Sequence, residues 1–269
     1  KKGDYEYVDM RFTDPRGKLQ HVTVIASEVD EGFLKSGWMF DGSSIAGWKS
    51  INESDMKLMP DLNSGYLDPF YSEKTYCLHC NVVEPESGKL YGRDPRSTAV
   101  KAEEYLKKTK IGTKAFFGPE AEFFLFDDVK FSNSMNKVSF EVDAMDASWN
   151  TDTSYEMGNM GHRPGVKGGY FPVNPTDAGQ DIRSEMLSTM KRMGMKVDKH
   201  HHEVASCQHE LGLVFDSLKA QGDNLQKYKY VIQNVAHSYG KSATFMPKPI
   251  ANDNGTGMHT NMSIWDGNS

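Results

Sequence analysis

Apolar residues in the first ninety positions fall in short runs separated by turn-forming residues, a pattern that favours β-strands. The sequence Asp14-Pro15-Arg16-Gly17 has proline and glycine where a type I turn prefers them, so the flanking runs are expected to form a hairpin. The stretch 84–88, which contains proline and glycine, ends the third run. Strands are therefore expected at 5–12, 19–25 and 74–83.

Helical spacing of apolar residues begins after Asp94, in segments that alternate with strand-like runs. Asp94 can cap a helix with Pro95 at its first position, and this helix would turn Val100, Tyr105 and Leu106 inward. We expect a domain boundary between Ser87 and Asp94, with domains at 1–90 and 94–269. Further helices are expected at 178–193 and 224–239, and further strands at 115–126, 197–203 and 257–265.

The two later helices carry clear end signals. Asp177 is expected to cap the helix 178–193, and Gly194 and Gly240 are expected to end the two helices. One face of each helix is apolar, which predicts burial of that face. The residues concerned are Ile182, Met186, Met190 and Met193 in the first helix and Leu225, Tyr228, Ile232 and Val235 in the second.

Composition narrows the class of protein. The chain is 38% hydrophobic and 25% charged with a formal net charge of −6, which suits a packed core and disfavours nucleic acid or an anionic membrane as partner. No run approaches the roughly 20 apolar residues of a membrane helix. Three cysteines are too few for a disulfide scaffold, and reduced thiols in the cytoplasm are the simpler interpretation. Cys77 and Cys80 have the spacing of a redox or zinc pair, but no second pair follows.

Three strand-like segments carry polar side chains at every second position, and alternate residues of a strand share a face. Glu120 and Glu122 lie among aromatic residues, and His201 and Glu203 precede Glu210 by a few positions. The third segment places His259, Asn261 and Ser263 on one face. Adjacent carboxylates in apolar surroundings repel each other unless a cation neutralises them. Taken singly, each of these patterns is equally compatible with an ordinary solvated strand.

Four glutamates and a histidine suit hard or borderline divalent ions such as Mg²⁺ or Mn²⁺, whereas structural zinc would draw on more Cys and His. Two such ions would balance four carboxylates, and a paired site suits phosphoryl transfer. The sequence contains no glycine-rich Walker loop, so no motif of this kind identifies a nucleotide. The residues alone therefore predict an acidic metal site on strands and no more.

The chain as a whole closely resembles type I, bacterial glutamine synthetase. The resemblance rests on an ordered set of motifs that covers essentially the entire sequence. These motifs are 40–45 (FDGSSI), 92–96 (GRDPR), 117–123 (FGPEAEF), 167–172 (KGGYFP), 201–204 (HHEV) and 248–259, which runs from Lys248-Pro249 to Asn254-Gly255-Thr256-Gly257-Met258-His259.

The resemblance implies an α+β fold, with a small N-terminal β-grasp domain and a larger α/β catalytic domain that has a curved antiparallel sheet. It implies that Glu122, Glu203 and Glu210 bind a first metal ion, and that Glu120 and His259 bind a second. Asn254 and Gly255 would bind substrate glutamate, and His201 would lie near the phosphoryl group. Positions near the nucleotide would be Asp198, Phe215, Asn261, Met262 and Ser263. Asp41, contributed by a neighbouring subunit, would bind and deprotonate ammonium.

The reaction implied by the resemblance has two steps: ATP phosphorylates the γ-carboxylate of L-glutamate, and ammonia then displaces phosphate. The implied assembly is a homo-oligomer of two stacked hexameric rings. By the same resemblance, a last metal ligand, arginines and a flap would follow Ser269. We therefore expect the 269-residue polypeptide alone to be inactive and to expose apolar surface. Two alternatives stay open at this point: a γ-glutamylpolyamine-type ligase, and a non-catalytic metal-binding paralogue that only builds or regulates the ring.

Overall fold

The computed structural model describes residues 4–149 and 161–267, which divide into two compact units. Of the described residues, the first unit contains 4–117, 216–226 and 262–267, and the second contains 118–149, 161–215 and 227–261. Three elements contribute residues to both units: β7 (Lys114–Phe126), α4 (Leu218–Ser238) and β13 (Met258–Trp265).

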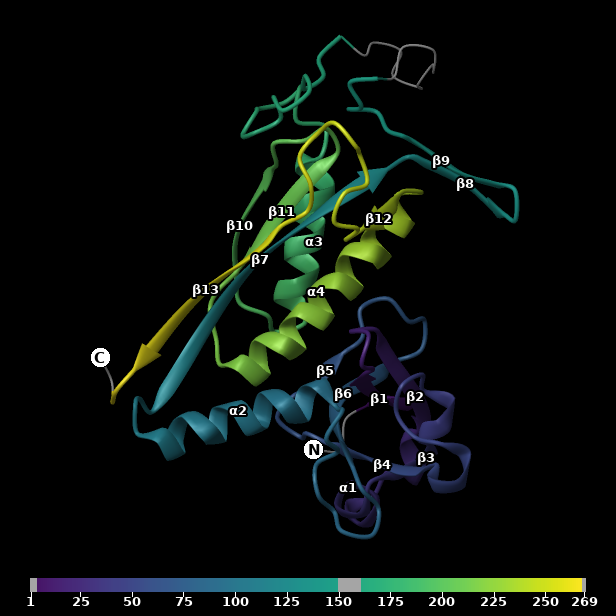
Figure 1. The fold of residues 1–269 in the computed structure, drawn as a ribbon, viewed down its shortest axis with the longest axis vertical. Coiled ribbons are helices and arrows are strands. Elements are labelled where there is room, and N and C mark those ends of the chain that lie inside the picture. The colour runs from purple at the N-terminus through teal and green to yellow at the C-terminus, as the bar shows by residue number, and fades with distance from the viewer. Residues whose placement is uncertain (1–3, 150–160, 268–269) are drawn as a thin grey trace. The chain divides into compact units, whose positions relative to one another are not determined.

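The first unit is built on a six-stranded sheet in the order β2-β1-β6-β4-β3, with β5 also paired to β6 (Figure 1). Strands β1 and β6 run parallel, and the other described pairs of this sheet are antiparallel. The helices α1 (Glu31–Ser36) and α2 (Pro95–Thr109) complete it. The strands are β1 (Tyr7–Thr13), β2 (Leu19–Ile25), β3 (Trp38–Asp41), β4 (Asp55–Pro60), β5 (Tyr66–Leu67) and β6 (Thr75–Val83).

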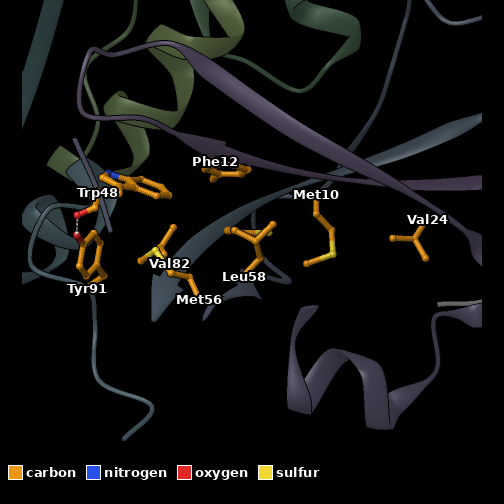
Figure 2. Packing of buried hydrophobic residues seen from close by; sticks show 9 residues of the cluster. Met10, Phe12, Val24, Trp48, Met56, Leu58, Val82 and Tyr91 are labelled. Carbon is orange, nitrogen blue, oxygen red and sulfur yellow. Dashed lines mark hydrogen bonds between the residues drawn. The ribbon is translucent and has the colours of Figure 1, made fainter. Parts of the chain in front are cut away.

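Alternate residues of these strands bury a core of aromatic, methionine and branched side chains (Figure 2). Tyr91 and Trp48 belong to this core, and the Tyr91 hydroxyl donates to the Trp48 carbonyl at 3.0 Å. The expected hairpin is confirmed, because Tyr7 to Thr13 pair in register with Ile25 to Leu19. Gly17, at φ 78°, occupies the left-handed conformation that glycine adopts without a steric cost.

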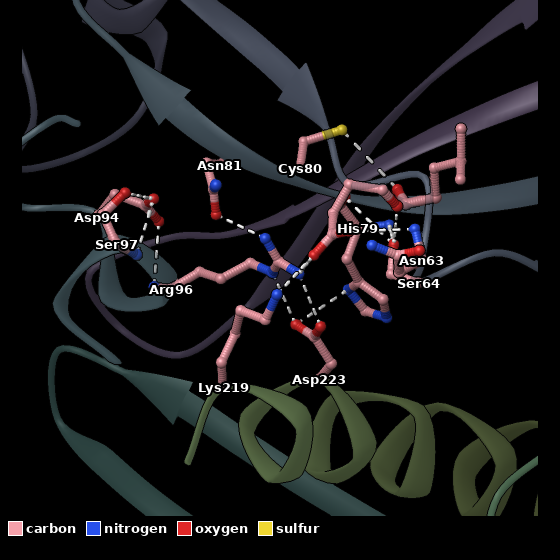
Figure 3. Close-up of polar contacts among 12 residues, drawn as sticks. Asn63, Ser64, His79, Cys80, Asn81, Asp94, Arg96, Ser97, Lys219 and Asp223 are labelled. Atoms are coloured by element: carbon pink, nitrogen blue, oxygen red, sulfur yellow. Dashed lines mark hydrogen bonds and ion pairs between the residues drawn. The ribbon is translucent and has the colours of Figure 1, made fainter. Parts of the chain in front are cut away.

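Asp94 caps α2 as expected, because its side chain accepts from the backbone N–H groups of Arg96 and Ser97. The inward face of this helix differs from the expectation: Tyr105 is 69% exposed, while Arg96 and Ser97 are buried. The Arg96 guanidinium in the first turn of the helix donates to Asp61, Asn81 and Asp223, so the buried side of α2 includes a charged side chain (Figure 3).

The second unit contains a sheet in the order β10-β11-β7-β12, with β13 also paired to β7. The neighbours along this order are antiparallel. Helix α3 packs against β10, and Tyr228 of α4 donates to the Ala121 carbonyl of β7 at 2.5 Å. The remaining strands and helix are β10 (Val197–His202), β11 (Gln208–Leu213), β12 (Ser242–Thr244) and α3 (Gln180–Arg192).

Helix α3 begins at Gln180 after Gly179, and no side chain caps it. The expected cap, Asp177, was wrong because its carboxylate pairs with Arg183 on the same helix instead. The apolar face was predicted well: Ile182, Met186 and Met190 are buried. Helix α4 starts six positions before the expected residue 224, and Gly194 and Gly240 both follow helix ends with positive φ.

A two-stranded hairpin that the sequence analysis did not predict projects from the second unit (Figure 1). It consists of β8 (Asp128–Ser134) and β9 (Lys137–Asp143), which pair in antiparallel register. Both strands are largely exposed, although apolar and polar residues alternate along them.

Candidate metal centre

Three neighbouring strands of the second unit bring an acidic cluster together. Glu122 of β7 lies opposite Glu210 of β11, and Glu210 lies opposite His201 of β10. Directly opposed residues of neighbouring strands project to the same face of a sheet. The register therefore places these three side chains in one row across the sheet.

The cluster is tight and largely buried. Ligand atoms of His201, Glu203 and Glu210 all lie within 4.8 Å of one another. His201 Nδ1 is 3.4 Å from Glu203 Oε1, and its Nε2 is 3.5 Å from Glu210 Oε1. Glu122, Glu203 and Glu210 are only 8%, 9% and 5% exposed. Two carboxylates and an imidazole therefore converge on one small volume, beside the Glu122 carboxylate.

Gln208 and Gly257 hold Glu122 in place. Its Oε2 accepts from Gln208 Nε2 at 2.5 Å and from the Gly257 backbone N–H at 2.9 Å. Gln208 Nε2 also donates to the Gly255 carbonyl at 2.9 Å. The sequence analysis missed Gln208, although it lies two positions before Glu210 on a strand and so shares its face.

The charges in the cluster repel one another. Burial raises the pKa of Glu203, and the neighbouring charges of Glu122 and Glu210 raise it further. Burial alone would lower the pKa of His201, but hydrogen bonding to Glu210 and the surrounding carboxylates raise it above its ordinary value. Neighbouring carboxylates contribute to both shifts, and a bound cation would offset their repulsion.

The donor set fits a hard divalent cation. Carboxylate oxygens with an imidazole beside them are ligands that Mg²⁺ or Mn²⁺ accepts, and the described part of the cluster offers no thiolate. Glu122, His201 and Glu210 lie on three strands of one sheet and Glu203 directly follows one of them, so the backbone brings the four side chains together without an ion. The residues present therefore satisfy the requirement for an acidic metal site.

Glu120 and His259 form a second, more open pair. His259 Nδ1 is 3.6 Å from Glu120 Oε2, and Lys199 Nζ is 4.0 Å from the other oxygen of Glu120. The side chains of His259 and Glu120 are 77% and 31% exposed. The structure thus brings together the two residues expected at a second ion, at a place accessible to solvent.

Two aromatic rings lie against His201. Tyr170 and Phe171 stack with centroids 4.0 Å apart, and both meet the imidazole edge-on, with centroids at 5.8 and 4.7 Å. Phe171 has a φ of 59°, a conformation unfavourable for a side chain of this size. The sequence analysis quoted these residues in a motif without giving them a role. Their bulk beside a partly buried histidine is consistent with shielding it from water.

The remaining predicted residues lie in different surroundings. Asn254 and Gly255 are connected to the cluster through Gln208, whereas Asp198 and Phe215 are exposed parts of the second unit. Asn261 is also exposed. It is the last residue of β13 that belongs to the second unit, whereas Met262 and Ser263 belong to the first unit.

Asp41, in the first unit, is an exposed carboxylate held by local hydrogen bonds. Its Oδ1 accepts from the Ser43 backbone N–H at 2.8 Å and from the Ser43 hydroxyl at 2.6 Å. These bonds lower the pKa of Asp41, so the group stays ionised over a wide pH range and is better suited to bind a cation than to hold a proton.

Within residues 4–149 and 161–267, no helix has the length and apolarity needed to cross a membrane.

Two family models match the chain. The model described as "Glutamine synthetase, beta-Grasp domain" matches residues 4–85, and "Glutamine synthetase, catalytic domain" matches 92–269. The expected fold class, a β-grasp domain followed by a mixed α/β catalytic domain, is thereby confirmed. The family models do not test the expected boundary between Ser87 and Asp94, which stays a prediction.

Individual proteins agree with the family models. The chain is 68% identical to glutamine synthetases of Cereibacter sphaeroides and Rhodobacter capsulatus over 265 residues, which are 98% of this chain and 57% and 60% of those proteins. Its fold matches a Plasmodium falciparum glutamine synthetase structure with a TM-score of 0.92 and 30% identity, over 100% of this chain and 52% of the other. The chain thus spans little more than half the length of these relatives. On its motifs, its fold and both family models, it belongs to the glutamine synthetase family.

Proposed function

We propose that the protein containing this chain joins ammonia to L-glutamate, with ATP converted to ADP and phosphate through γ-glutamyl phosphate. One observation carries the proposal. In a chain of this family, Glu122, His201, Glu203 and Glu210 lie together on or directly beside adjacent strands, where the charges of Glu122 and Glu210 repel that of Glu203. That arrangement is what a ligase needs in order to handle polyphosphate, because phosphoryl transfer depends on positioning and charge neutralisation.

Family membership implies the use of ATP and a divalent metal ion. We assign Glu122, Glu203 and Glu210 to a first ion and Glu120 and His259 to a second, with Mg²⁺ or Mn²⁺ as the ions. When bound, such ions would neutralise phosphate oxygens and orient them. The chain's own contribution is to hold Glu122 of β7 and Glu210 of β11 in register, with Glu203 directly after β10, and to bury these three carboxylates.

The substrate assignments follow from the same proposal. Asn254 and Gly255 would bind L-glutamate beside the first ion, because Gln208 joins their loop to Glu122. His201 would face the transferred phosphoryl group, for which its raised pKa favours the cationic form. Asp41 of a neighbouring subunit would bind ammonium, the role that its lowered pKa suits. The nucleotide positions would be Asp198, Phe215, Asn261, Met262 and Ser263.

Phosphate release tests the proposal, using the protein encoded by the complete reading frame with ATP, Mn²⁺ and L-glutamate. Ammonium should stimulate release, and Glu122→Ala should lower kcat/KM by at least about 100-fold, because metal-site substitutions of this kind are costly. Glu104→Gln, which changes an exposed acid of α2, serves as the control.

The alternatives give different outcomes in this assay. Release that depends on a polyamine in place of ammonium would identify a γ-glutamylpolyamine-type ligase. Mn²⁺ binding without any amine-dependent release would identify a non-catalytic ring paralogue. Either outcome would overturn the proposal.

We further propose that the protein is a homo-oligomer, with two stacked hexameric rings as the assembly and the cytoplasm as its location. The β8–β9 hairpin supports self-association. Its register places Val129, Phe131, Val138 and Phe140 on one face, and these residues are 41%, 81%, 78% and 62% exposed. An isolated two-stranded hairpin is only marginally stable in water. A second copy of the chain that covers this apolar face would therefore stabilise the hairpin.

Phe131→Ser combined with Phe140→Ser should therefore shift the assembly to smaller species, because the substitutions remove the apolar area available for contact. The masses would be measured by analytical ultracentrifugation of the complete protein. Lys130→Ser combined with Glu141→Ser alters the opposite, polar face of the hairpin and provides the matched control. An unchanged mass distribution for the phenylalanine variant would remove this face from the interface.

A further inference from the structure

Asp253 is a buried carboxylate that belongs to no part of the predicted metal site. It is 3% exposed and lies directly before Asn254 and Gly255. Its Oδ1 accepts from the backbone N–H groups of Lys167 at 3.1 Å and Asn254 at 3.0 Å. Its Oδ2 accepts from the Ser206 backbone N–H at 3.1 Å. One side chain thus joins three segments that are far apart in the sequence.

Each of the three segments carries part of the candidate site. Lys167 begins the stretch that leads to Tyr170 and Phe171, the rings stacked against His201. Ser206 lies in the connection between the strands of Glu203 and Glu210. The third segment is the loop of Asn254 and Gly255 itself.

The segments are also joined around Asp253 by backbone bonds. The Gly169 N–H donates to the Val204 carbonyl at 3.0 Å, and the Glu203 N–H donates to the Gln208 carbonyl at 2.8 Å. Lys248 Nζ donates to the main-chain oxygen of Asp253. A carboxylate that accepts several N–H bonds makes charge-assisted bonds, which are stronger than neutral ones. Burial away from water makes loss of such bonds costly.

We infer that Asp253 is a positioning residue that sets the loop of Asn254 and Gly255 against the metal strands, and so controls binding of the amino-acid substrate. The inference rests on the proposed function only for the identity of that substrate. Asp253 contacts the loop backbone and not the reacting atoms, so its effect should fall on substrate affinity. Glu122 and Glu210 are held by the register of β7 and β11, and Glu203, directly after β10, is held by its backbone bond to the Gln208 carbonyl.

Two substitutions separate the bonds of the two carboxylate oxygens. In Asp253→Asn, the amide oxygen can keep the Lys167 and Asn254 bonds if it takes the Oδ1 position, but its NH₂ group then faces the Ser206 N–H. In Asp253→Ala, all three bonds are lost. The damage should therefore be graded, with the asparagine variant intermediate.

Hydrogen exchange measured on this chain tests the positioning role without any activity. Asp253→Asn should speed exchange mainly around Ser206, at least about 10-fold, and Asp253→Ala should speed it at all three segments. Asp266→Asn, which changes an exposed carboxylate, should change none of them. Unaltered protection in Asp253→Ala would overturn the inference.

Steady-state kinetics of the complete protein test the functional consequence. Asp253→Ala should raise KM for L-glutamate about 10-fold or more and should change KM for ATP and the Kd for Mn²⁺ by a smaller factor, because the loop of Asn254 and Gly255 directly follows Asp253, whereas Glu122 and Glu210 stay paired on β7 and β11. Equal changes in all three constants would indicate a general loss of structure and contradict the inference. If the unaltered protein does not use glutamate, the proposed function fails, and the exchange result still decides whether Asp253 positions the loop.

Discussion

Replacing Glu203 with glutamine is expected to weaken Mn²⁺ binding by on the order of 100-fold and, at the same time, to raise the melting temperature of the metal-free chain. Both effects have one origin. Glu203 is held beside Glu122 and Glu210 in a buried site, where burial and these two charges raise its pKa. The negative charge is therefore unfavourable without an ion and necessary with one.

The sign of the stability effect follows from the raised pKa. A carboxyl whose pKa is higher in the folded state binds its proton more tightly there. Its contribution favours folding at low pH and is lost as the pH rises from the unfolded pKa through the higher folded value. At neutral pH the charged Glu203 thus destabilises the metal-free fold, and the neutral glutamine removes that cost while it can still accept the Val204 N–H.

Isothermal titration with Mn²⁺ and thermal melting at pH 7.5 measure the two effects on the same samples. Saturating Mn²⁺ should reverse the order of melting temperatures, because a ligand stabilises the form that binds it. Glu104→Gln should leave both quantities unchanged, since this glutamate is exposed on α2. Unaltered Mn²⁺ affinity in Glu203→Gln would remove this residue from the ligand set.

Arg183→Met should lower the free energy of unfolding by about 3–5 kcal/mol, the cost of leaving a buried charge without its partner. Arg183 is fully buried on α3, and its two terminal nitrogens donate to Asp177 at 2.9 and 2.5 Å. It also donates to His200 Nδ1 at 3.2 Å and contacts His209 Nδ1 at 2.9 Å. Burial, together with the charges of His202 and Arg183, lowers the pKa of His209, so this ring is neutral and accepts.

A double-mutant cycle measured by urea unfolding separates the ion pair from simple packing. Asp177→Leu combined with Arg183→Met should lose less stability than the sum of the single changes, because each single variant leaves one buried charge unpaired and the double variant leaves none. Arg192→Met, at an exposed position of the same helix, should cost under about 0.5 kcal/mol. Additive single effects, or a loss below about 1 kcal/mol for Arg183→Met, would contradict the assigned role.

Local signals predicted much of the fold. Asp94 and Pro95 marked a helix start, and Gly194 and Gly240 marked helix ends, because caps depend on a few neighbouring residues. Asp177 is not the cap because α3 begins at Gln180, three positions later; its carboxylate pairs with Arg183 and accepts from the Gly179 N–H. The β8–β9 hairpin was missed although Val129, Phe131, Val138 and Phe140 alternate with polar residues in the sequence, the pattern of a strand with one apolar face.

The candidate site was only partly predictable from its residues. Alternation along a strand gives the face that Glu120 and Glu122 share, but not which strand lies beside them. The pairing of Glu122 with Glu210 depends on the strand order β10-β11-β7, which no local pattern encodes. The family resemblance supplied those residues and their roles, and the roles stay predictions. Asp253 gave no signal, because its three partners are backbone groups.

The location of a bound ion tests the central claim most directly. Crystals of the chain grown with Mn²⁺, with diffraction recorded at the manganese edge, would show the ion by its anomalous signal. We predict a peak about 2.0–2.6 Å from carboxylate oxygens of Glu122 on β7, Glu210 on β11 and Glu203 directly after β10. A manganese peak elsewhere, or none among these three side chains at saturating Mn²⁺, would contradict the account.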